Sequence, residues 1–213
     1  GVVQVTVFSP DDLELVKGGP SLRRGWIDAA VAARNPRDAA LRSEVERVLK
    51  QRNALLRSVR GGLDADAEFT LEVWDSKLAD AGERLRTARQ ALLDDMAPIL
   101  ATAYDAVAQQ AAMVECHYES SWSGPLADAL LISRDPDLRR GVTTVGPHRD
   151  EIHVTIAGAP ARTHASQGEQ RSLALALRLA ADGVIRTVGV VEPVLLLDDC
   201  LLYTSPSPRD DEL

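Results

Sequence analysis

The sequence contains few of the residues that mark several common classes of protein. Only two of its 213 residues are cysteines, and neither lies in a Cys-x-x-Cys or Cys/His cluster, which argues against a disulfide framework or a structural zinc site. Aromatic residues make up 4% of the chain, so aliphatic and alanine side chains must supply most of the core. No stretch approaches the roughly 18–20 uninterrupted apolar residues of a membrane span, so we expect a cytoplasmic protein with no membrane partner.

Lysine is also scarce, and the charge is unevenly distributed. Three lysines stand against 21 arginines, and the net charge is −8. The first 60 residues carry a balance of +4, whereas the remaining residues carry −12. A basic segment on an acidic protein can bind phosphates on one face, and an ordinary solvated helix surface is the alternative interpretation.

Periodic apolar residues predict a helical arm in the first half of the chain. One seam has alternating spacings of three and four, which is typical of a helix packed against an antiparallel partner; it comprises Leu71, Trp74, Leu78, Ala81, Leu85, Ala88 and Leu92. The predicted partner is a helix over residues 36–60, with Arg52 on its apolar stripe. Pro98 is expected to end or kink the second helix before it resumes to about residue 110.

Strand-like segments surround this arm. Residues 2–8, 113–119 and 151–156 have strand patterns, a hairpin turn follows residue 156, and a helix is predicted over residues 167–181. The apolar run at residues 194–197 suits a strand buried on both faces, as in a parallel sheet. The order indicates an α/β domain into which the arm is inserted.

Two motifs in the second half of the chain carry chemistry. The apolar run ends at Asp198 and Asp199, which is the form of a Walker B strand. Upstream, Ser166-Gln167-Gly168-Glu169-Gln170-Arg171 precedes an apolar helix, and we call these residues the signature loop. A hydroxyl and free backbone N–H groups at a helix N-terminus suit a phosphate, while Ser166 with Glu169 also fits an ordinary capping box. Their order and spacing favour the functional interpretation.

The two motifs resemble the head of ABC-type ATPases, and further segments are similar to the RecF family. These segments are residues 8–20 and 23–28, with Trp26 in place of the usual Phe or Tyr, and residues 146–150 and 161–168. The resemblance implies an α/β ABC-ATPase head (P-loop NTPase-like) fragment with an inserted antiparallel helical arm. On this basis residues 1–20 end the first ATPase lobe, 21–111 form the arm, 112–199 form the ATPase core, and 200–213 are a non-native or disordered tail.

The same resemblance implies a function and roles for individual residues. Members of this family are DNA-binding, slowly hydrolysing ATPases that dimerise with ATP between the subunits and act with RecR and RecO to load recombinase at single-strand gaps. Asp198 would hold Mg²⁺ through water, and Asp199 would act on the attacking water. The γ-phosphate of ATP on the opposite subunit would be contacted by Ser166, Gln167, Gly168, Glu169 and Gln170. Candidate DNA contacts are Arg23, Arg24, Arg34, Arg37 and Arg42.

Two departures from the family pattern limit these expectations. Glu169 stands where the family commonly has Gln, which adds a negative charge beside the expected phosphate. No GxxxxGK[ST] P-loop occurs in the chain, although its backbone N–H groups and lysine would cradle the β- and γ-phosphates. We therefore expect this chain alone to be inactive as an ATPase. The alternatives are the head of another SMC- or Rad50-like ATPase, and a helical interaction module without nucleotide chemistry.

Overall fold

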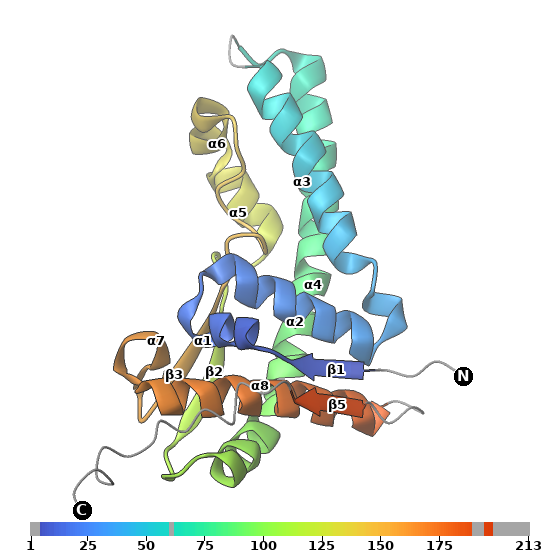
Figure 1. Ribbon diagram of the computed structural model, residues 1–213. Coiled ribbons are helices and arrows are strands. Elements are labelled where there is room, and N and C mark those ends of the chain that lie inside the picture. Colours follow the sequence, from blue (N-terminus) through green and yellow to red (C-terminus); the bar gives the residue numbers. More distant parts are fainter. Residues whose placement is uncertain (1–4, 60–61, 189–193, 198–213) are drawn as a thin grey trace, which may run out of the picture.

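The computed structural model describes residues 5–59, 62–188 and 194–197, which form a base and an upright arm (Figure 1). The arm consists of α3, the first half of α4, α5 and α6, and the base contains the other elements and the second half of α4. In chain order the elements are β1 (Val5–Phe8), η1 (Pro10–Leu13), α1 (Glu14–Lys17), α2 (Pro20–Arg34), η2 (Pro36–Asp38), α3 (Leu41–Ser58), α4 (Ala65–Val107), β2 (Val114–Glu119), α5 (Leu126–Ile132), α6 (Arg134–Arg140), β3 (Glu151–Ile156), β4 (Ala159–Pro160), α7 (Ala161–His164), α8 (Gln167–Val188) and β5 (Val194–Leu197).

The arm is an antiparallel pair of helices, as the heptad seam predicts. Along the seam Leu71, Leu78, Ala81, Leu85 and Leu92 are buried, whereas Trp74 and Ala88 are only partly covered. Against them α3 presents apolar residues on its predicted stripe; these are Leu41, Val45, Val48 and Leu49. The helix predicted over 36–60 begins with the separate turn η2, because Asn35 caps that turn by accepting a hydrogen bond from the Arg37 N–H at 3.2 Å.

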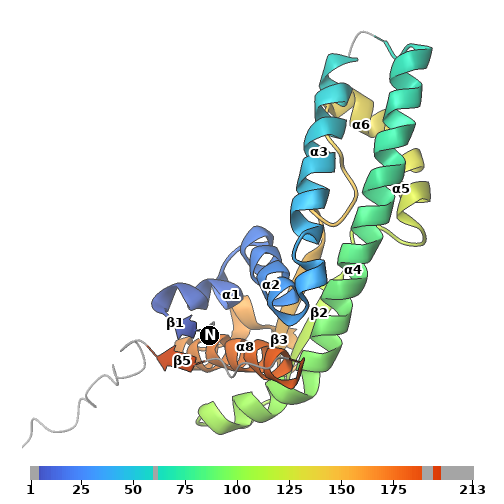
Figure 2. The same ribbon diagram turned by 90° about the vertical axis from the view of Figure 1, so that its right-hand side faces the viewer.

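Helix α4 extends without a break over 43 residues, so of the two outcomes expected at Pro98, an end or a kink, the end of the helix is wrong. Proline removes one backbone hydrogen bond and crowds the preceding turn. Here the flanking residues Met96 and Leu100 are buried, and Ile99 lies so close to Gly183 of α8 that a Cβ at Gly183 would come within 3.1 Å. Tertiary packing thus stabilises the helix across the proline. Figure 2 shows that the C-terminal part of α4 turns away from the axis of the arm.

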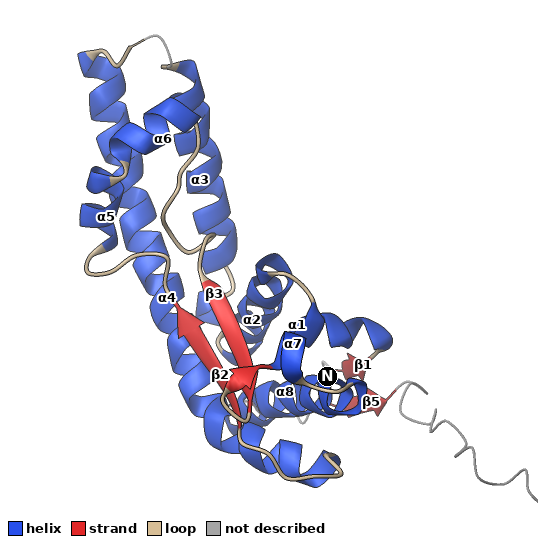
Figure 3. Cartoon of the chain, turned by 90° about the vertical axis from the view of Figure 1, so that its left-hand side faces the viewer, coloured by secondary structure: helices blue, strands red, loops and turns tan. Residues whose placement is uncertain are grey.

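Helix α5 packs closely on the arm where α4 has a glycine. A Cβ at Gly82 would lie 2.5 Å from a methyl group of Leu126, so only glycine permits this approach without a shift. Leu126 and Leu130 are fully buried there, and the Leu126 N–H donates to Glu83 Oε1 at 2.8 Å. Helix α5 therefore forms a third layer of the arm, with α6 following it (Figure 3).

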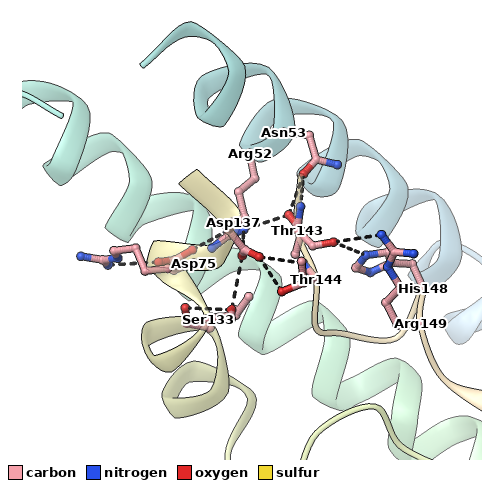
Figure 4. A network of polar contacts seen from close by, with 11 residues as sticks. Arg52, Asn53, Asp75, Ser133, Asp137, Thr143, Thr144, His148 and Arg149 are labelled. Atoms are coloured by element: carbon pink, nitrogen blue, oxygen red, sulfur yellow. Dashed lines mark hydrogen bonds and ion pairs between the residues drawn. The ribbon is translucent and has the colours of Figure 1, made fainter. Parts of the chain in front are cut away.

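A buried polar network joins the arm helices to the loop that follows α6 (Figure 4). Arg52 is 0% exposed; its Nε donates to Asp75 at 2.6 Å, and its Nη1 donates to Asp137 at 2.7 Å and to Thr143 Oγ1 at 2.9 Å. Asp137, also 0% exposed, accepts hydrogen bonds from the N–H and hydroxyl of Thr144 at 2.9 and 2.6 Å. One arginine on the apolar stripe of α3 thereby fixes α4, α6 and the loop to each other.

The base contains two small sheets, in agreement with the predicted strands. β2 and β3 pair antiparallel from Val114–Ile156 to Glu119–Glu151, and the short β4 extends the pair after the hairpin turn. β1 and β5 pair in parallel from Val5–Val194 to Phe8–Leu197, which confirms the parallel strand predicted over residues 194–197. Since β1 and β5 are far apart in sequence, this pairing brings the two ends of the described chain together (Figure 1).

The core of the base is built on the apolar face of α8. Leu173, Ala174, Ala176 and Leu177 are all 0% exposed, and they pack with Ile27 and Val31 of α2, Met96 and Leu100 of α4, and Ile152 of β3. The alanines let neighbouring helices approach closely. Burial on this scale contributes about 25 cal/mol for each Å² of apolar surface removed from water, so this core holds the N-terminus of α8 in place.

Candidate functional site

The signature loop lies at the N-terminus of α8, where Ser166 and Glu169 form a reciprocal capping box. The Ser166 N–H donates to Glu169 Oε2 at 2.7 Å, and the Glu169 N–H donates to Ser166 Oγ at 3.3 Å. The hydrogen bond to Ser166 lowers the pKa of the Glu169 carboxyl, so this group is ionised at neutral pH. The ordinary capping role that the sequence allows is therefore realised.

The capping box leaves several donors of the loop available to a ligand. Ser166, Gln167 and Gly168 are exposed, and no atom lies within 4 Å of the position that a Cβ on Gly168 would occupy. The Ser166 hydroxyl accepts one hydrogen bond, and its own hydrogen interacts with the Glu169 carboxylate, so a ligand would compete with Glu169 for it. The first N–H groups of a helix also have no partner within that helix. These donors fit an anionic ligand, whereas the charge of Glu169 opposes one.

Gln170 was grouped with the loop from its sequence, but its side chain points into the base and is 7% exposed. Its Nε2 donates to the backbone oxygen of Ala165 at 3.0 Å and to that of Arg162 at 3.5 Å. Its Oε1 is buried without a hydrogen-bond partner among the described atoms. Each residue turns the helix by about 100°, so Gln170 faces inward while Gln167 and Gly168 face solvent. In the structure Gln170 holds the backbone that precedes Ser166.

Two contacts that sequence reasoning missed hold α8 against the rest of the base. Arg178 donates from Nε to Asp12 Oδ1 at 2.7 Å, and the other oxygen of Asp12 accepts the Ser9 N–H at 2.9 Å. At the start of the helix, the Ser172 hydroxyl donates to the backbone oxygen of Val107, the last residue of α4, at 3.3 Å. Because Asp12 and Arg178 are 166 residues apart in sequence, no local pattern could have paired them.

The loop after α6 meets the base at a second polar cluster. Arg89 of α4 donates to both carboxylate oxygens of Asp28 at 2.7 and 2.9 Å and to the backbone oxygen of Pro147 at 2.8 Å. Asp150 accepts the Ser121 N–H at 2.7 Å and the hydroxyl hydrogen of Tyr118. Burial raises the pKa of Asp150, against the hydrogen bonds from Tyr118 and Ser121, which lower it. Residues 146–150, noted for their family resemblance, therefore join the arm to the base.

The five candidate DNA contacts have different surroundings, and Arg23 is the most buried of them. Arg23 is 8% exposed and donates to Glu151 at 3.0 Å and to the backbone oxygen of Gly18 at 2.7 Å, so its guanidinium is already bound. Arg34 forms an ion pair with Asp95. The remaining three candidates are at least partly exposed; they are Arg24, Arg37 and Arg42.

The acidic pair at the end of the predicted Walker B strand lies outside the described residues. The strand itself, β5, is described to Leu197 and pairs in parallel with β1, as a strand of the expected parallel sheet would, but the roles of Asp198 and Asp199 stay predictions. Within the described part of the chain, no three His, Cys, Asp or Glu side chains are arranged to hold a metal ion. Over the same residues no helix is both long and apolar enough to cross a membrane.

Comparison with known proteins relates almost the whole chain to one group. The DNA replication and repair protein RecF of Cutibacterium acnes is 42% identical, over 99% of this chain and 60% of that protein. The proteins of the same name from Frankia alni and Streptomyces avermitilis are 44% and 42% identical, each over 93% of this chain and 57% of its own length. No family model matches the chain.

Solved structures give the same result. The recombination mediator protein RecF of the RecFOR pathway, solved with ATP, matches with a TM-score of 0.84 and 30% identity over 92% of this chain and 55% of that one. The structure with ATPγS matches with a TM-score of 0.84 and 29% identity, over 94% and 56%. The fold and the signature loop thus define part of an ABC-type ATPase head with a helical arm. The chain belongs to the RecF family and spans 57–60% of the length of the curated relatives it matches.

Proposed function

We propose that this chain supplies the signature loop and the arm of a RecF-type ATPase, which binds DNA and dimerises with ATP at single-strand gaps to promote recombinase loading. The observation that carries this proposal is the exposed signature loop at the N-terminus of α8, in a chain 42–44% identical to RecF proteins. The structures of the related RecF with ATP and ATPγS support ATP as the nucleotide of the proposed site. The RecFOR pathway of those proteins supports RecR and RecO as partners.

The loop residues fit a γ-phosphate that is presented by a second subunit. Ser166 would donate its hydroxyl hydrogen, and Gln167 and Gly168 would donate backbone N–H groups, aided by the helix dipole. ATP would supply the phosphoryl group that water attacks. Asp198 would position Mg²⁺ through water and Asp199 would orient the attacking water. Glu169 repels the same phosphate, which is consistent with slow turnover.

The DNA part of the proposal is supported by the exposed arginines of α2, η2 and α3. Arginine side chains contact backbone phosphates with little sequence preference, and such binding weakens steeply as salt increases. The acidic balance of the rest of the chain favours one DNA-binding face, because other surfaces repel the phosphates.

A charge placed in the signature loop tests this function. In a full-length RecF that carries this loop, Ser166→Arg should abolish ATP-dependent dimerisation, because the larger side chain occupies the space of the phosphate and removes the hydroxyl donor. Sedimentation with and without ATP measures the dimer. Thr187→Arg is the matched control, since it adds the same charge to the exposed C-terminal end of the same helix. It should leave the dimer intact.

Two outcomes would contradict the proposal. ATP-dependent dimerisation that survives Ser166→Arg would remove the signature loop from the nucleotide site. A full-length protein that does not respond to ATP at all would favour the helical interaction module.

The chain by itself, without a P-loop, should show no Mg²⁺-dependent ATP turnover. Turnover that Asp199→Asn abolishes would show that a P-loop is not required.

A further inference from the structure

A cavity of about 180 Å³ lies where α2, α3 and α4 meet the loop after α6. None of its lining residues belongs to the signature loop. Its volume is below the roughly 300 Å³ at which pockets for drug-sized ligands begin, so the cavity suits a small group. The charged and titratable side chains that line it are Arg24, Asp28, Arg42, Glu46, Arg89 and His148.

The carboxylates of the cavity already have arginine partners, whereas one guanidinium has no carboxylate partner. Asp28 is bound by Arg89 in two hydrogen bonds, and Glu46 accepts from the Nε of Arg42 at 2.8 Å. Arg24 donates only to a neutral group, the backbone oxygen of Asp150, at 2.8 Å. Among the described residues no carboxylate forms an ion pair with Arg24. The lining thus holds three guanidiniums against two carboxylates. Arg24 is the guanidinium without an ion-pair partner, and the charges of Glu151, Asp150 and Asp28 act on it only from a distance.

His148 adds no charge to this lining at neutral pH. Burial lowers the pKa of His148 to about 4, and its Nε2 lies 3.1 Å from the backbone oxygen of Thr143. The neutral ring therefore carries its proton on Nε2 and donates it to that oxygen.

Gly25 leaves the space between Arg24 and Arg42 open. Arg42 reaches from α3 towards α2, and its Nη1 lies 3.6 Å from the position that a Cβ on Gly25 would occupy. Arg42 is 52% exposed and uses only Nε for Glu46, so both of its Nη groups are available. Arg24, next to Gly25 in sequence, is partly exposed. Two guanidinium forks therefore face one small opening.

We infer that this cavity binds a single phosphate group, held by Arg24 and Arg42. A carboxylate has two oxygens and is matched by one guanidinium fork, whereas a phosphate has enough oxygens to accept from two forks at once. The group can come from the DNA backbone or from free phosphate. That the phosphate group belongs to DNA rests on the proposed function, whereas the existence of the phosphate site does not.

Inorganic phosphate tests the site in the purified chain, with binding measured by titration calorimetry. Arg24→Gln removes the unpaired charge, and Gly25→Leu fills the opening without changing any charge. Each should weaken phosphate binding about tenfold or more, as expected for the loss of a charge-assisted hydrogen bond. Arg57→Gln is the charge-matched control, because Arg57 is exposed on α3 and lies outside the cavity; it should bind phosphate as the unchanged chain does. Circular dichroism confirms that each variant is folded.

The outcomes separate the site from its source. No phosphate binding, or equal binding by the unchanged chain and Arg24→Gln, overturns the inference. Loss in Arg24→Gln with none in folded Gly25→Leu also overturns it, because the arginine would then act outside the cavity. The second part of the experiment measures DNA binding by fluorescence anisotropy with a labelled DNA duplex. Parallel loss of DNA and phosphate binding in both variants supports the backbone as source. Phosphate binding without DNA binding supports the site and a free phosphate, and counts against the DNA part of the proposed function.

Discussion

The arm and the base are stabilised by different kinds of interior. The base encloses α8 in aliphatic side chains from α2, α4 and β3. The arm has only two long helices and the short α5 and α6, and at its centre stands a fully buried arginine bound to two carboxylates. A narrow helical pair has less apolar surface to bury than a layered base. In the arm, alignment of the helices therefore depends on directional polar contacts, whereas in the base it depends on packing.

This difference bears on how the parts move relative to each other. Salt bridges in a low-dielectric interior have demanding geometry, because misaligned partners leave charges without compensation. The Arg52 network should therefore keep α3, α4 and α6 together as one body. Helix α4 continues from this body to the first turns of α8, where Val107 accepts from Ser172, so one continuous helix connects the arm with the helix that carries the signature loop.

The largest effect is expected when the positive charge at the centre of the arm is removed, because this tests whether the arm depends on polar contacts. Arg52→Met leaves the fully buried Asp137 without its cation, while the largely buried Asp75 keeps only its ion pair with Arg134. We expect the free energy of unfolding to fall by about 3–5 kcal/mol, the usual loss when one member of a buried ion pair is removed. Urea denaturation measures it. Arg57→Met, exposed on the same helix, is the control. A loss below about 1 kcal/mol for Arg52→Met would show that the arm does not depend on this network.

A smaller effect is expected at the junction of arm and base, where acid should destabilise the fold through His148. In the unfolded chain a histidine binds a proton as the pH falls below about 6.5, whereas burial lowers the pKa of folded His148 to about 4. Between these values the unfolded state binds more protons, so stability falls as the pH decreases.

Denaturation at pH 7 and pH 4 measures the contribution of His148. The unchanged chain should lose more stability over this range than His148→Gln, by on the order of 2 kcal/mol. His117→Gln is the control, because the His117 side chain is 56% exposed. Equal losses in the unchanged chain and His148→Gln would contradict the prediction.

The smallest effect is expected within the base, at one of the polar atoms that are buried without a hydrogen-bond partner. Tyr104 is 0% exposed and its hydroxyl has no hydrogen-bond partner among the described atoms. Tyr104→Phe removes a desolvated group, so we expect no loss of stability and a gain of up to about 1 kcal/mol. Tyr118→Phe, which removes a donor to Asp150, should instead destabilise. If Tyr104→Phe destabilised as much as Tyr118→Phe, the packing of the base would depend on that hydroxyl.

Local patterns in the sequence predicted most of the elements, and tertiary packing decided the exceptions. The heptad seam, β3 and the start of α8 were predicted because apolar periodicity and capping act within a few residues. The continuation of α4 through Pro98 depends on its contact with Gly183, which is remote in sequence. Similarly, Arg23 has the positive charge that a DNA contact needs, but Glu151 of β3 binds its guanidinium. The sequence shows the charge of a basic residue, but only the tertiary structure shows which group it binds.

For the candidate site, the sequence by itself determined the signature loop, the capping pair and the family resemblance, because these depend on residue types at short spacing. The tertiary structure decided which side chains the loop presents. Helical rotation and the apolar core turn Gln170 inward and leave Ser166, Gln167 and Gly168 at the surface. It also placed Arg24 and Arg42 at the same cavity, and it paired Asp28 with Arg89 and Glu46 with Arg42. Charge balance around a cavity depends on distances between helices, and no local pattern specifies those distances.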